Sequence, residues 1–346
     1  MRSPFLHATI LLLICASFAL AWDTPGHEQI ADMAYTRLTP AAKNKIREIL
    51  QHGDPRYVPA NNGDDTLRDA FRRASSFPDV IRDPGASTVF DDAYVDRMNL
   101  TFQPDVSPQQ LAKPKSEYIR CKTWHYYDTP IHYSTSHAPK IYESNALVAY
   151  NYATAQLAKL KNSAAGADLR DAAWWLCWIE HLTGDLHQPL HCTSNYAHNH
   201  RGDIGGNAVN IIAPWDGASG ALHAVNLHSY WDEGIDHAAG GHRSARQDLT
   251  PADAMEVTDA WLRNNQLKPG DSDAADLNVA HWIAQGAALA DAHVYQETNA
   301  AGQTQEIIDG TNVTPQYTTD QIDVCEHQAV RAAYRLAAVL NGIFQP

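Results

Sequence analysis

Histidine and aspartate recur in this chain at spacings that suit metal binding. His181 and Asp185 are four residues apart, and His191 follows six residues after Asp185. Residues four apart lie on one face of a helix, so the side chains of His181 and Asp185 can point at a single metal ion. Pro189 is expected to end or bend this helix, which would let His191 turn toward a neighbouring ion.

A second pair, His228 and Asp232, repeats the four-residue spacing. Imidazole nitrogens combined with carboxylate oxygens, without thiolates, form the ligand set of hydrolytic zinc sites. One such pair would be a weak signal. Two pairs, one of them followed by an additional histidine, predict a metal centre.

The first 21 residues are typical of a secretory signal peptide. Arg2 supplies a positive charge, residues 5–20 are mostly apolar, and residues 19–21 read Ala-Leu-Ala, a small-x-small cleavage site. The apolar run is short for a membrane span, and no later segment is long enough. The chain is therefore expected to be secreted or periplasmic, with no membrane association.

Cleavage after residue 21 would make Trp22 the first residue of the mature chain. Its free α-amine and its own carbonyl oxygen could then chelate a metal, and His27 is close enough in sequence to join them. The alternative is that Trp22 is an ordinary buried aromatic residue.

The remaining elements are predicted from hydrophobic periodicity and from capping residues. Thr39 is expected to cap a helix that begins at Pro40, and Asp168 to cap another. The segments 118–133 and 208–212 look extended, with one short hairpin each, and residues 193–206 look like a loop. The sequence thus predicts a mainly α fold, with helices near 26–37, 40–51, 66–82, 141–162, 168–188, 251–265, 274–296 and 319–342.

The other histidines allow less specific predictions. His187 has the wrong helical phase to share an ion with His181, and we expect it to orient a metal ligand through a hydrogen bond. Four histidines are expected to be ordinary solvent-exposed residues: His198, His200, His237 and His242.

Length and composition agree with an exported globular enzyme. The chain has 346 residues, and 44% of them are hydrophobic, which is enough for a sizeable core. The motifs extend from residue 22 to residue 232, which favours a single domain over 22–346. Nothing in the sequence indicates a protein partner, so a monomer is expected.

The net charge is −14, and loss of Arg2 with the signal peptide would make it one unit more negative. This sign is wrong for a protein that follows the backbone of duplex nucleic acid, where stripes of Lys and Arg are expected. A cluster of zinc ions would instead create a local positive field that holds one phosphate. The acidic exterior would discourage non-specific duplex binding.

Four cysteines would remain after cleavage: Cys121, Cys177, Cys192 and Cys325. An even number in an oxidising compartment suggests two disulfides, and the sequence does not choose among the three possible pairings. Alternatively, Cys192 is a free buried thiol. Asn99 and Asn312 begin glycosylation sequons, which matter only if the source organism glycosylates.

Together these features resemble the zinc-dependent type I nucleases, single-strand-specific nucleases that also act as 3′-nucleotidases, in the phospholipase C/nuclease superfamily. The resemblance covers most of the mature chain, although residues from about 297 to 322 match nothing in it. The matching motifs are Trp22-x4-His27, Ser76-Phe77-Pro78-Asp79-Val80-Ile81-Arg82, Trp124-His125-Tyr126-Tyr127-Asp128, the His181 to His191 stretch, Gly205-Gly206-Asn207, Asn226-Leu227-His228-Ser229-Tyr230-Trp231-Asp232 and Tyr334-Arg335-Leu336-Ala337.

The resemblance implies a single compact helical domain of the phospholipase C/nuclease type with one or two short hairpins, and three zinc ions. The implied ligands of the first zinc are Asp79, His125, His181 and Asp185. Those of the second are Trp22, through its amine and carbonyl, and His27, with Asp185 bridging the two ions. Those of the third are His191, His228 and Asp232. Paired zinc ions can activate a water nucleophile, and the third can stabilise the leaving 3′ oxygen, so that a 5′-phosphate product results.

Several further residues are candidates for catalysis and substrate binding. Arg82, three residues after Asp79, could bind a phosphate and stabilise transition-state charge, while Asp79 orients the water; the alternative is a plain surface ion pair. Tyr126 could stack on an unpaired base, Asp128 could accept hydrogen bonds from a base edge, and Asn207 could donate to it. The alternatives for these three are a core tyrosine, a capping aspartate and a tight turn.

The predicted substrates are single-stranded DNA, single-stranded RNA and 3′-nucleotides, because a stacked and paired base cannot enter a pocket built for a flipped-out base. Two other functions remain open. A zinc-dependent phospholipase C resembles the same fold and zinc scaffold, but Asp232 stands where it would carry Glu. A secreted zinc-sequestering protein without catalysis would have no need of Arg82.

Overall fold

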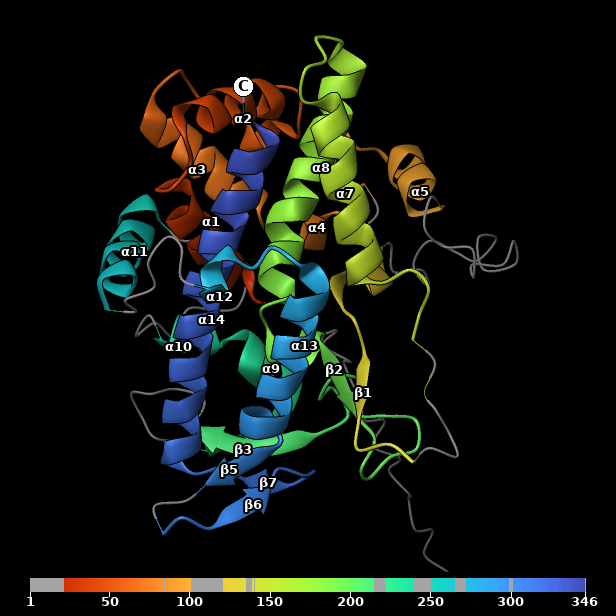
Figure 1. Ribbon diagram of the computed structural model, residues 1–346, viewed down its shortest axis with the longest axis vertical. Helices are drawn as coiled ribbons and strands as arrows, with labels where there is room; N and C mark the ends of the chain where they lie inside the picture. Colours follow the sequence, from red (N-terminus) through yellow and green to blue (C-terminus); the bar gives the residue numbers. More distant parts are fainter. Residues whose placement is uncertain are drawn as a thin grey trace, which may run out of the picture.

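The computed structural model describes residues 22–83, 85–100, 121–134, 139, 141–214, 222–238, 250–264, 272–298 and 301–345. Most of these residues are helical, and four helices form the centre of the molecule (Figure 1). α8 (Gly166–Asp185) packs against α7 (Ala146–Leu160) and against α14 (Pro315–Ile343), and α1 (Thr24–Tyr35) packs against both α8 and α14. The predicted mainly α fold is confirmed.

α8 is buried along most of its length because it carries apolar and aromatic side chains on every face. Trp174 and Trp178 are fully buried and pack on one another, and Trp178 also packs on Trp124. The expected cap was wrong, because Ala165 precedes the helix and Asp168 lies in its first turn. α8 ends at Asp185, before Pro189, and Pro189 begins the 3-10 helix η4 (Pro189–His191).

Helix-start residues explain α1 and α2 (Pro40–Leu50). The side chain of Asp23 accepts a hydrogen bond from the backbone N–H of Gly26, and that of Thr39 accepts one from Ala42, as predicted for the second helix. Each helix also has proline in its first turn, where a missing N–H costs nothing.

The single helix predicted over 66–82 was wrong. It is divided into α3 (Asp64–Ala74) and α4 (Phe77–Val80). The hydroxyls of Ser75 and Ser76 donate to the carbonyls of Arg72 and Arg73, at 2.7 and 3.0 Å, and so compete with the backbone ladder. Pro78 also lacks the N–H that a continuous helix would use. The break leaves the carbonyl of Ser75 free to accept a hydrogen bond from another residue.

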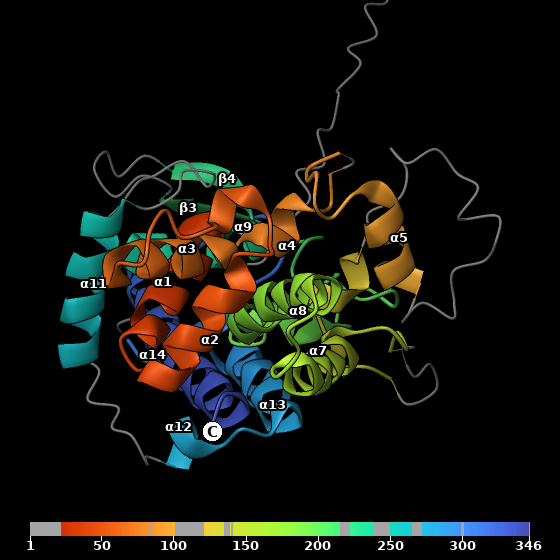
Figure 2. The same cartoon turned by 90° about the horizontal axis from the view of Figure 1, so that it is seen from above.

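The outer helices complete the bundle. α11 (Pro251–Asn264) and α5 (Asp92–Leu100) lie on opposite sides of it, as the view from above shows (Figure 2). The region predicted as one helix over 274–296 contains α12 (Ser272–Ala275), α13 (Val279–Leu289) and a π-helical turn, η5 (Ala290–Val294). The remaining short helices are η1 (Pro55–Tyr57), η3 (Lys122–His125), α9 (Leu227–Asp232) and α10 (Gly234–Ala238).

The strands are short and form three small sheets. β3 (Asn210–Pro214) pairs antiparallel with β4 (Leu222–Asn226), which confirms the hairpin expected near 208–212, and β7 (Thr311–Asn312) joins it in parallel. The hairpin expected within 118–133 was wrong, because β1 (Thr129–Ile131) pairs in parallel with β2 (Thr193–Asn195). A further antiparallel pair joins β5 (Gln296–Thr298) and β6 (Thr304–Glu306), in a segment that the resemblance left unplaced.

Buried residues from Trp22 to Phe344 form one continuous hydrophobic core. All four described cysteines are buried free thiols, so the expected disulfides are not formed. Two of the sulfurs pack closely on glycines of different helices, Cys192 on Gly286 of α13 and Cys325 on Gly234 of α10. Within the described part of the chain, no helix is both long and apolar enough to cross a membrane.

Candidate metal centre

Among the described residues, three groups of histidine and aspartate side chains come together inside the molecule. Six elements supply them: α1, α4, η3, α8, η4 and α9. Within each group, the ligand atoms lie within 4.8 Å of one another. The groups are His27, His181 and Asp185; Asp79, His125 and His181; and His191, His228 and Asp232.

Asp185 connects the first two groups through its two carboxylate oxygens. Its Oδ1 lies 3.3 Å from His27 Nε2. Its Oδ2 lies 3.1 Å from His125 Nδ1 and 3.4 Å from His181 Nε2. One oxygen therefore faces each of two adjacent metal positions, which is the arrangement of a bridging ligand.

Asp79 completes the second group. Its Oδ1 is 3.7 Å from His181 Nε2 and 3.9 Å from His125 Nδ1, while those two nitrogens are 3.0 Å apart. The third group is similar, because Asp232 lies 3.9 Å from His191 Nε2 and 3.5 Å from His228 Nε2. Separations of 3 to 4 Å between donor atoms are those of ligands that surround a common ion about 2 Å from each of them.

Backbone carbonyls fix which nitrogen of each histidine is available. His191 Nδ1 lies 2.7 Å from the carbonyl oxygen of His125, and His228 Nδ1 lies 2.5 Å from that of Gly205. A carbonyl oxygen only accepts, so each Nδ1 carries the proton and each Nε2 presents a lone pair. The two Nε2 atoms face each other at 3.1 Å with no proton between them, which is unfavourable unless a cation lies nearby.

His181 follows the same rule, and the break between α3 and α4 provides its partner. His181 Nδ1 donates to the carbonyl of Ser75 at 2.8 Å, which leaves Nε2 for a metal. Burial lowers the pKa of His181 to about 3 and that of His228 to about 4. Both imidazoles are therefore neutral near pH 7, as metal ligands must be.

Several buried polar atoms of the centre have no hydrogen-bond partner among the described residues. They are both nitrogens of His27, Nε2 of His125, both oxygens of Asp79, and Oδ1 of Asp185, although Asp79 Oδ1 is in ion-pair contact with Arg82. Burial, and then the charge of Asp79, raises the pKa of Asp185 well above its usual value. Buried carboxylates and imidazoles that lack hydrogen bonds are costly, and divalent cations would satisfy them. The donor set therefore fits zinc.

A glycine lets α1 approach α8 at the first group. The indole of Trp22 donates to the carbonyl of Gly184 at 2.8 Å, and the rings of His27 and His181 stack at 3.9 Å. A β-carbon on Gly184 would lie 2.7 Å from His27 Nδ1. The Trp22 side chain is thus a buried aromatic packed beside the first group, as the alternative interpretation expected.

Arg82 and Asp79 form the ion pair that the sequence left as an alternative. Arg82 Nη2 lies 3.0 Å from Asp79 Oδ1, and Arg82 Nε donates to the Asp79 carbonyl at 3.2 Å. The pair is not on the open surface, because the two side chains are only 14% and 8% exposed. Burial is the main cause of the lowered pKa of His27 and of His125, and the positive charge of Arg82 adds to it. The contact with Asp79, a member of the second group, places Arg82 beside the metal groups.

Tyr126 and Asp128 lie next to the centre and are half-buried. Tyr126 meets the edge of Tyr142, with ring centroids 6.4 Å apart. Burial, and then the negative charge of Asp203, raises the pKa of Asp128 to about 7. Asp128 is therefore a partly protonated carboxyl group that can both donate and accept hydrogen bonds near neutral pH.

Asn207 has a structural task in its own loop. Its side-chain amide nitrogen donates to the backbone carbonyl of Ile204 at 2.9 Å. Its backbone carbonyl accepts from the side-chain amide of Asn226 at 2.6 Å. One of its two amide hydrogens thus holds the Gly205-Gly206 turn, as the tight-turn alternative expected, and donation to a base stays a prediction.

The ring of His187 makes no hydrogen bond to a residue of the metal groups, so that expectation was wrong. Its Nδ1 donates to the carbonyl of Thr183 at 2.6 Å, and its Nε2 accepts from Arg335 at 2.8 Å. The neighbouring residue makes such a hydrogen bond instead, because Gln188 Nε2 donates to Asp232 Oδ1 at 2.6 Å. Spacing alone gave no signal for Gln188. Of the four histidines expected at the surface, His198 and His200 are exposed, the side chain of His237 is not described, and His242 lies outside the described residues.

Ile204 is a second residue that sequence reasoning missed. Its φ of 58° is left-handed, which is rare for a β-branched residue, and its side chain is 63% exposed. It directly precedes Gly205, whose carbonyl holds His228. Such strain is often retained where a side chain has a function.

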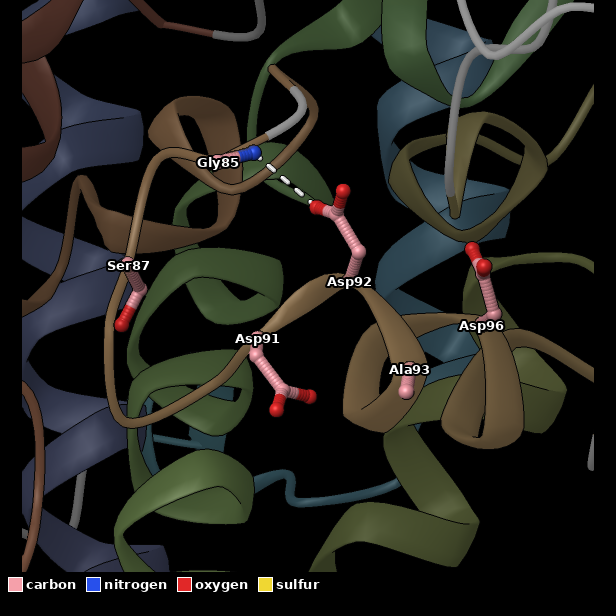
Figure 3. Close-up of a pocket in the computed structure, with 6 residues that line it drawn as sticks. All are labelled: Gly85, Ser87, Asp91, Asp92, Ala93 and Asp96. Atoms are coloured by element: carbon pink, nitrogen blue, oxygen red, sulfur yellow. Dashed lines mark hydrogen bonds between the residues drawn. The ribbon is translucent and has the colours of Figure 1, made fainter.

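A separate pocket lies between the loop after α4 and the first turns of α5 (Figure 3). Its charged side chains are all carboxylates, and it contains none of the predicted site residues. Asp92 accepts a hydrogen bond from the backbone of Gly85 at 2.9 Å. Negative charge repels phosphate, so this pocket does not suit a nucleic acid. Its lining residues are Gly85, Ser87, Asp91, Asp92, Ala93 and Asp96.

Comparison with known proteins agrees with the geometry. Endonuclease 2 of Arabidopsis thaliana is 24% identical over 347 residues, which cover 97% of this chain and 95% of that protein. Nuclease S1 of Aspergillus oryzae is 27% identical over 49% of this chain and 53% of its own length, and Nuclease P1 of Penicillium citrinum is 28% identical over 49% and 57%. The model of the S1/P1 nuclease family matches residues 22–345, and this chain therefore belongs to that family.

Proposed function

We propose that this protein is a tri-zinc endonuclease that hydrolyses phosphodiester bonds in single-stranded DNA and RNA, leaves 5′-phosphate products, and also acts as a 3′-nucleotidase. Membership of the S1/P1 nuclease family makes it a nuclease. The observation that carries the finer proposal is the set of three histidine–aspartate groups, two of which share His181 and are connected by the two carboxylate oxygens of Asp185.

The proposed ligands follow the three groups. Asp79, His125, His181 and Asp185 would hold one zinc; His27, Asp185 and the amine and carbonyl of Trp22 a second; and His191, His228 and Asp232 the third. Bound zinc would supply the Lewis acidity that activates water near neutral pH and offsets the charge of a phosphate.

Arg82 is the proposed phosphate-binding residue of the chain. Its guanidinium is held beside the metal groups by two contacts with Asp79. This orientation is fixed before substrate arrives, and donors that need no rearrangement stabilise developing negative charge well. Asp79 would therefore both bind metal and aim Arg82.

The proposed base site lies beside the metal groups. Tyr126 and the exposed side chain of Ile204 offer apolar contact with an unstacked base, and Asp128 offers a carboxyl group for its polar edge. A base in a duplex is stacked and paired, so it cannot reach such a pocket without being flipped out. This supports a preference for single strands. The acidic outer surface would further disfavour the binding of duplex nucleic acid.

We further propose that residues 1–21 are a signal peptide and that residues 22–346 form the mature enzyme, secreted or periplasmic and monomeric. The positive residue, apolar stretch and small-x-small site of the first 21 residues support export.

The test is release of mononucleotides by protein that begins at Trp22. Single-stranded DNA, single-stranded RNA and duplex DNA of one sequence would be compared before zinc removal, after it, and after zinc is restored. Release from single strands that disappears with zinc and returns with it is the expected result. A folded, fully metallated sample that releases nothing, or that instead hydrolyses phosphatidylcholine, would exclude the proposed function.

A further inference from the structure

Three buried polar side chains form a line along α14. Gln321, Gln328 and Arg335 are seven residues apart, so they lie on one face of the helix. Each is at most 2% exposed. Buried helix faces are normally apolar, and polar groups in them need specific partners. We call these three residues the polar stripe.

The first residue of the polar stripe holds α9. Gln321 Nε2 donates to the carbonyl of Tyr230 at 2.5 Å. The neighbouring Trp231 donates from its indole to the hydroxyl of Tyr317, one turn earlier on α14, at 2.9 Å. Both contacts fall between His228 and Asp232, two ligands of the third metal group.

Gln328 and Arg335, the other two residues of the polar stripe, hold the turn before His191, which is the remaining ligand of the third metal group. Gln328 Nε2 donates to the carbonyl of His187 at 3.0 Å, and Arg335 donates to the ring nitrogen of the same residue at 2.8 Å. His187 lies between α8 and η4, four residues before His191. A guanidinium only donates, so Arg335 fixes His187 as the tautomer that donates to the carbonyl of Thr183 in α8.

Arg335 is itself held from a third side. It donates to the amide oxygen of Gln285 on α13 at 2.9 Å, and its guanidinium lies over the ring of Trp282, 5.1 Å from the centroid. The end of the stripe is thus anchored to the bundle rather than to the metal centre.

We propose that the polar stripe sets the spacing between His191 and the pair His228 and Asp232, and so determines how tightly the third group binds zinc. α9 and η4 belong to different segments of the chain, and α14 is one continuous helix that hydrogen-bonds to α9 and to His187, just before η4. A shift of either segment along α14 would separate the ligands. The stripe residues touch neither substrate nor metal, so they are positioning residues. This inference rests on the proposed function.

The experiment uses Gln321→Leu and Gln328→Leu, which keep the side-chain size but remove the donor. Asn341→Leu is the control, because Asn341 lies on the same helix and exchanges hydrogen bonds with Arg37 and Thr39, away from the metal groups. Zinc bound per protein is measured after dialysis against increasing chelator concentrations, and the melting temperature is measured alongside.

Both glutamine variants are expected to release one of three zinc ions at a chelator concentration about 10-fold lower than the wild-type protein does, since outer hydrogen-bond partners change metal affinity by about that factor. The other two ions should leave as in the wild type. Asn341→Leu should keep the wild-type zinc profile even if it melts earlier. If the leucine variants do not fold, Gln321→Asn and Gln328→Asn keep the amide but shorten the side chain. Binding of the same single zinc ion should then be weaker than in the wild type.

Two results would overturn the role of the stripe while the nuclease proposal stands: variants with the wild-type zinc profile, or variants that lose all three ions together in proportion to their melting temperature. Wild-type protein that binds no zinc would instead overturn the proposed function, and the role of the stripe with it.

Discussion

Asp185 is the residue on which two of the three metal groups depend, because its two oxygens face different histidines. Asp185→Asn keeps the shape but replaces one oxygen with an amide nitrogen, which cannot bind a cation. We expect zinc content to fall from three toward one and kcat to fall by more than about 100-fold, since even outer partners of metal ligands contribute 10- to 100-fold. Zinc analysis and single-stranded DNA hydrolysis measure both.

The control for Asp185 is Asp291→Asn, which removes an exposed carboxylate paired with His132 at 2.6 Å. This variant should keep its zinc and its activity. Full zinc content in Asp185→Asn would contradict the bridging role.

Asp128 gives a pH-dependent prediction. Burial and Asp203 raise its pKa to about 7, whereas an unfolded chain ionises it near pH 4. The native state therefore loses stability relative to the unfolded state as the pH rises from about 4 to 7. Asp128→Asn should be more stable than the wild type at pH 8, and this advantage should shrink toward pH 4.5. Thermal melting at both pH values measures it, and an equal advantage at both would refute the assignment.

Ile204 combines strain with exposure, so its two effects can be separated. Ile204→Gly removes the left-handed strain and should stabilise the fold by about 1 kcal/mol. It also removes apolar contact with a base, worth about 1 kcal/mol if about half the side chain is buried, so KM for single-stranded DNA should rise about fivefold. A stabilised variant with unchanged KM would show that Ile204 does not touch the substrate.

The four-residue spacing predicted that His181 would meet Asp185 and that His228 would meet Asp232, and the structure places both pairs in candidate metal groups. Asp79 and His125 were expected from the resemblance and not from spacing.

The sequence could not identify Gln188, Ile204 or the carbonyl of Ser75. Their roles depend on where the chain turns, and the same residues occur in many other settings. Asn207 is the opposite case. The motif identified it, but one of its amide hydrogens bonds to the carbonyl of Ile204 in its own loop.

Among the elements, α8 and α1 determine the geometry of the first metal group. Their contact passes through Gly184, where a β-carbon would overlap the ring of His27. Gly184→Ala should therefore displace His27, remove one zinc and reduce activity at least about 10-fold. Gly166→Ala is the matched control on the same helix, because its β-carbon would meet nothing closer than 3.9 Å. Three retained zinc ions in Gly184→Ala would show that His27 adapts.

Helices with clear caps and long apolar faces were predictable as elements, as Thr39 and α2 show. Pairings between distant segments were not. β1 and β2 pair although they are far apart in the sequence: Thr129 lies opposite Thr193, 64 positions later. Neither strand alone indicates its partner. The break at Ser75 was hidden because Ser is tolerated inside helices, and only the competing hydrogen bonds decide the outcome.

At the scale of the whole molecule, the metal centre reconciles an acidic protein with an anionic substrate. The chain carries 26 basic and 40 acidic side chains, yet its six ligand-bearing elements gather several carboxylates and imidazoles in one buried region. Bound cations would reverse the local sign of the field there and leave the exterior negative. Affinity for a nucleic acid would then come from a single phosphate site.

If residues 1–21 are removed as proposed, activity should depend on where the mature chain begins. Trp22 is fully buried, and its indole is held by Gly184 beside His27. If its amine binds zinc, protein that begins at Trp22 should hold three zinc ions, and the same protein with one Met ahead of Trp22 should hold two. It should also lose most activity, because a peptide nitrogen is not a ligand of the same kind as a free amine. Zinc analysis of the two proteins measures this, with similar melting temperatures after zinc removal as the control for folding. Equal zinc and equal activity would assign Trp22 to the core alone and leave His27 and Asp185 as the only protein ligands of that ion.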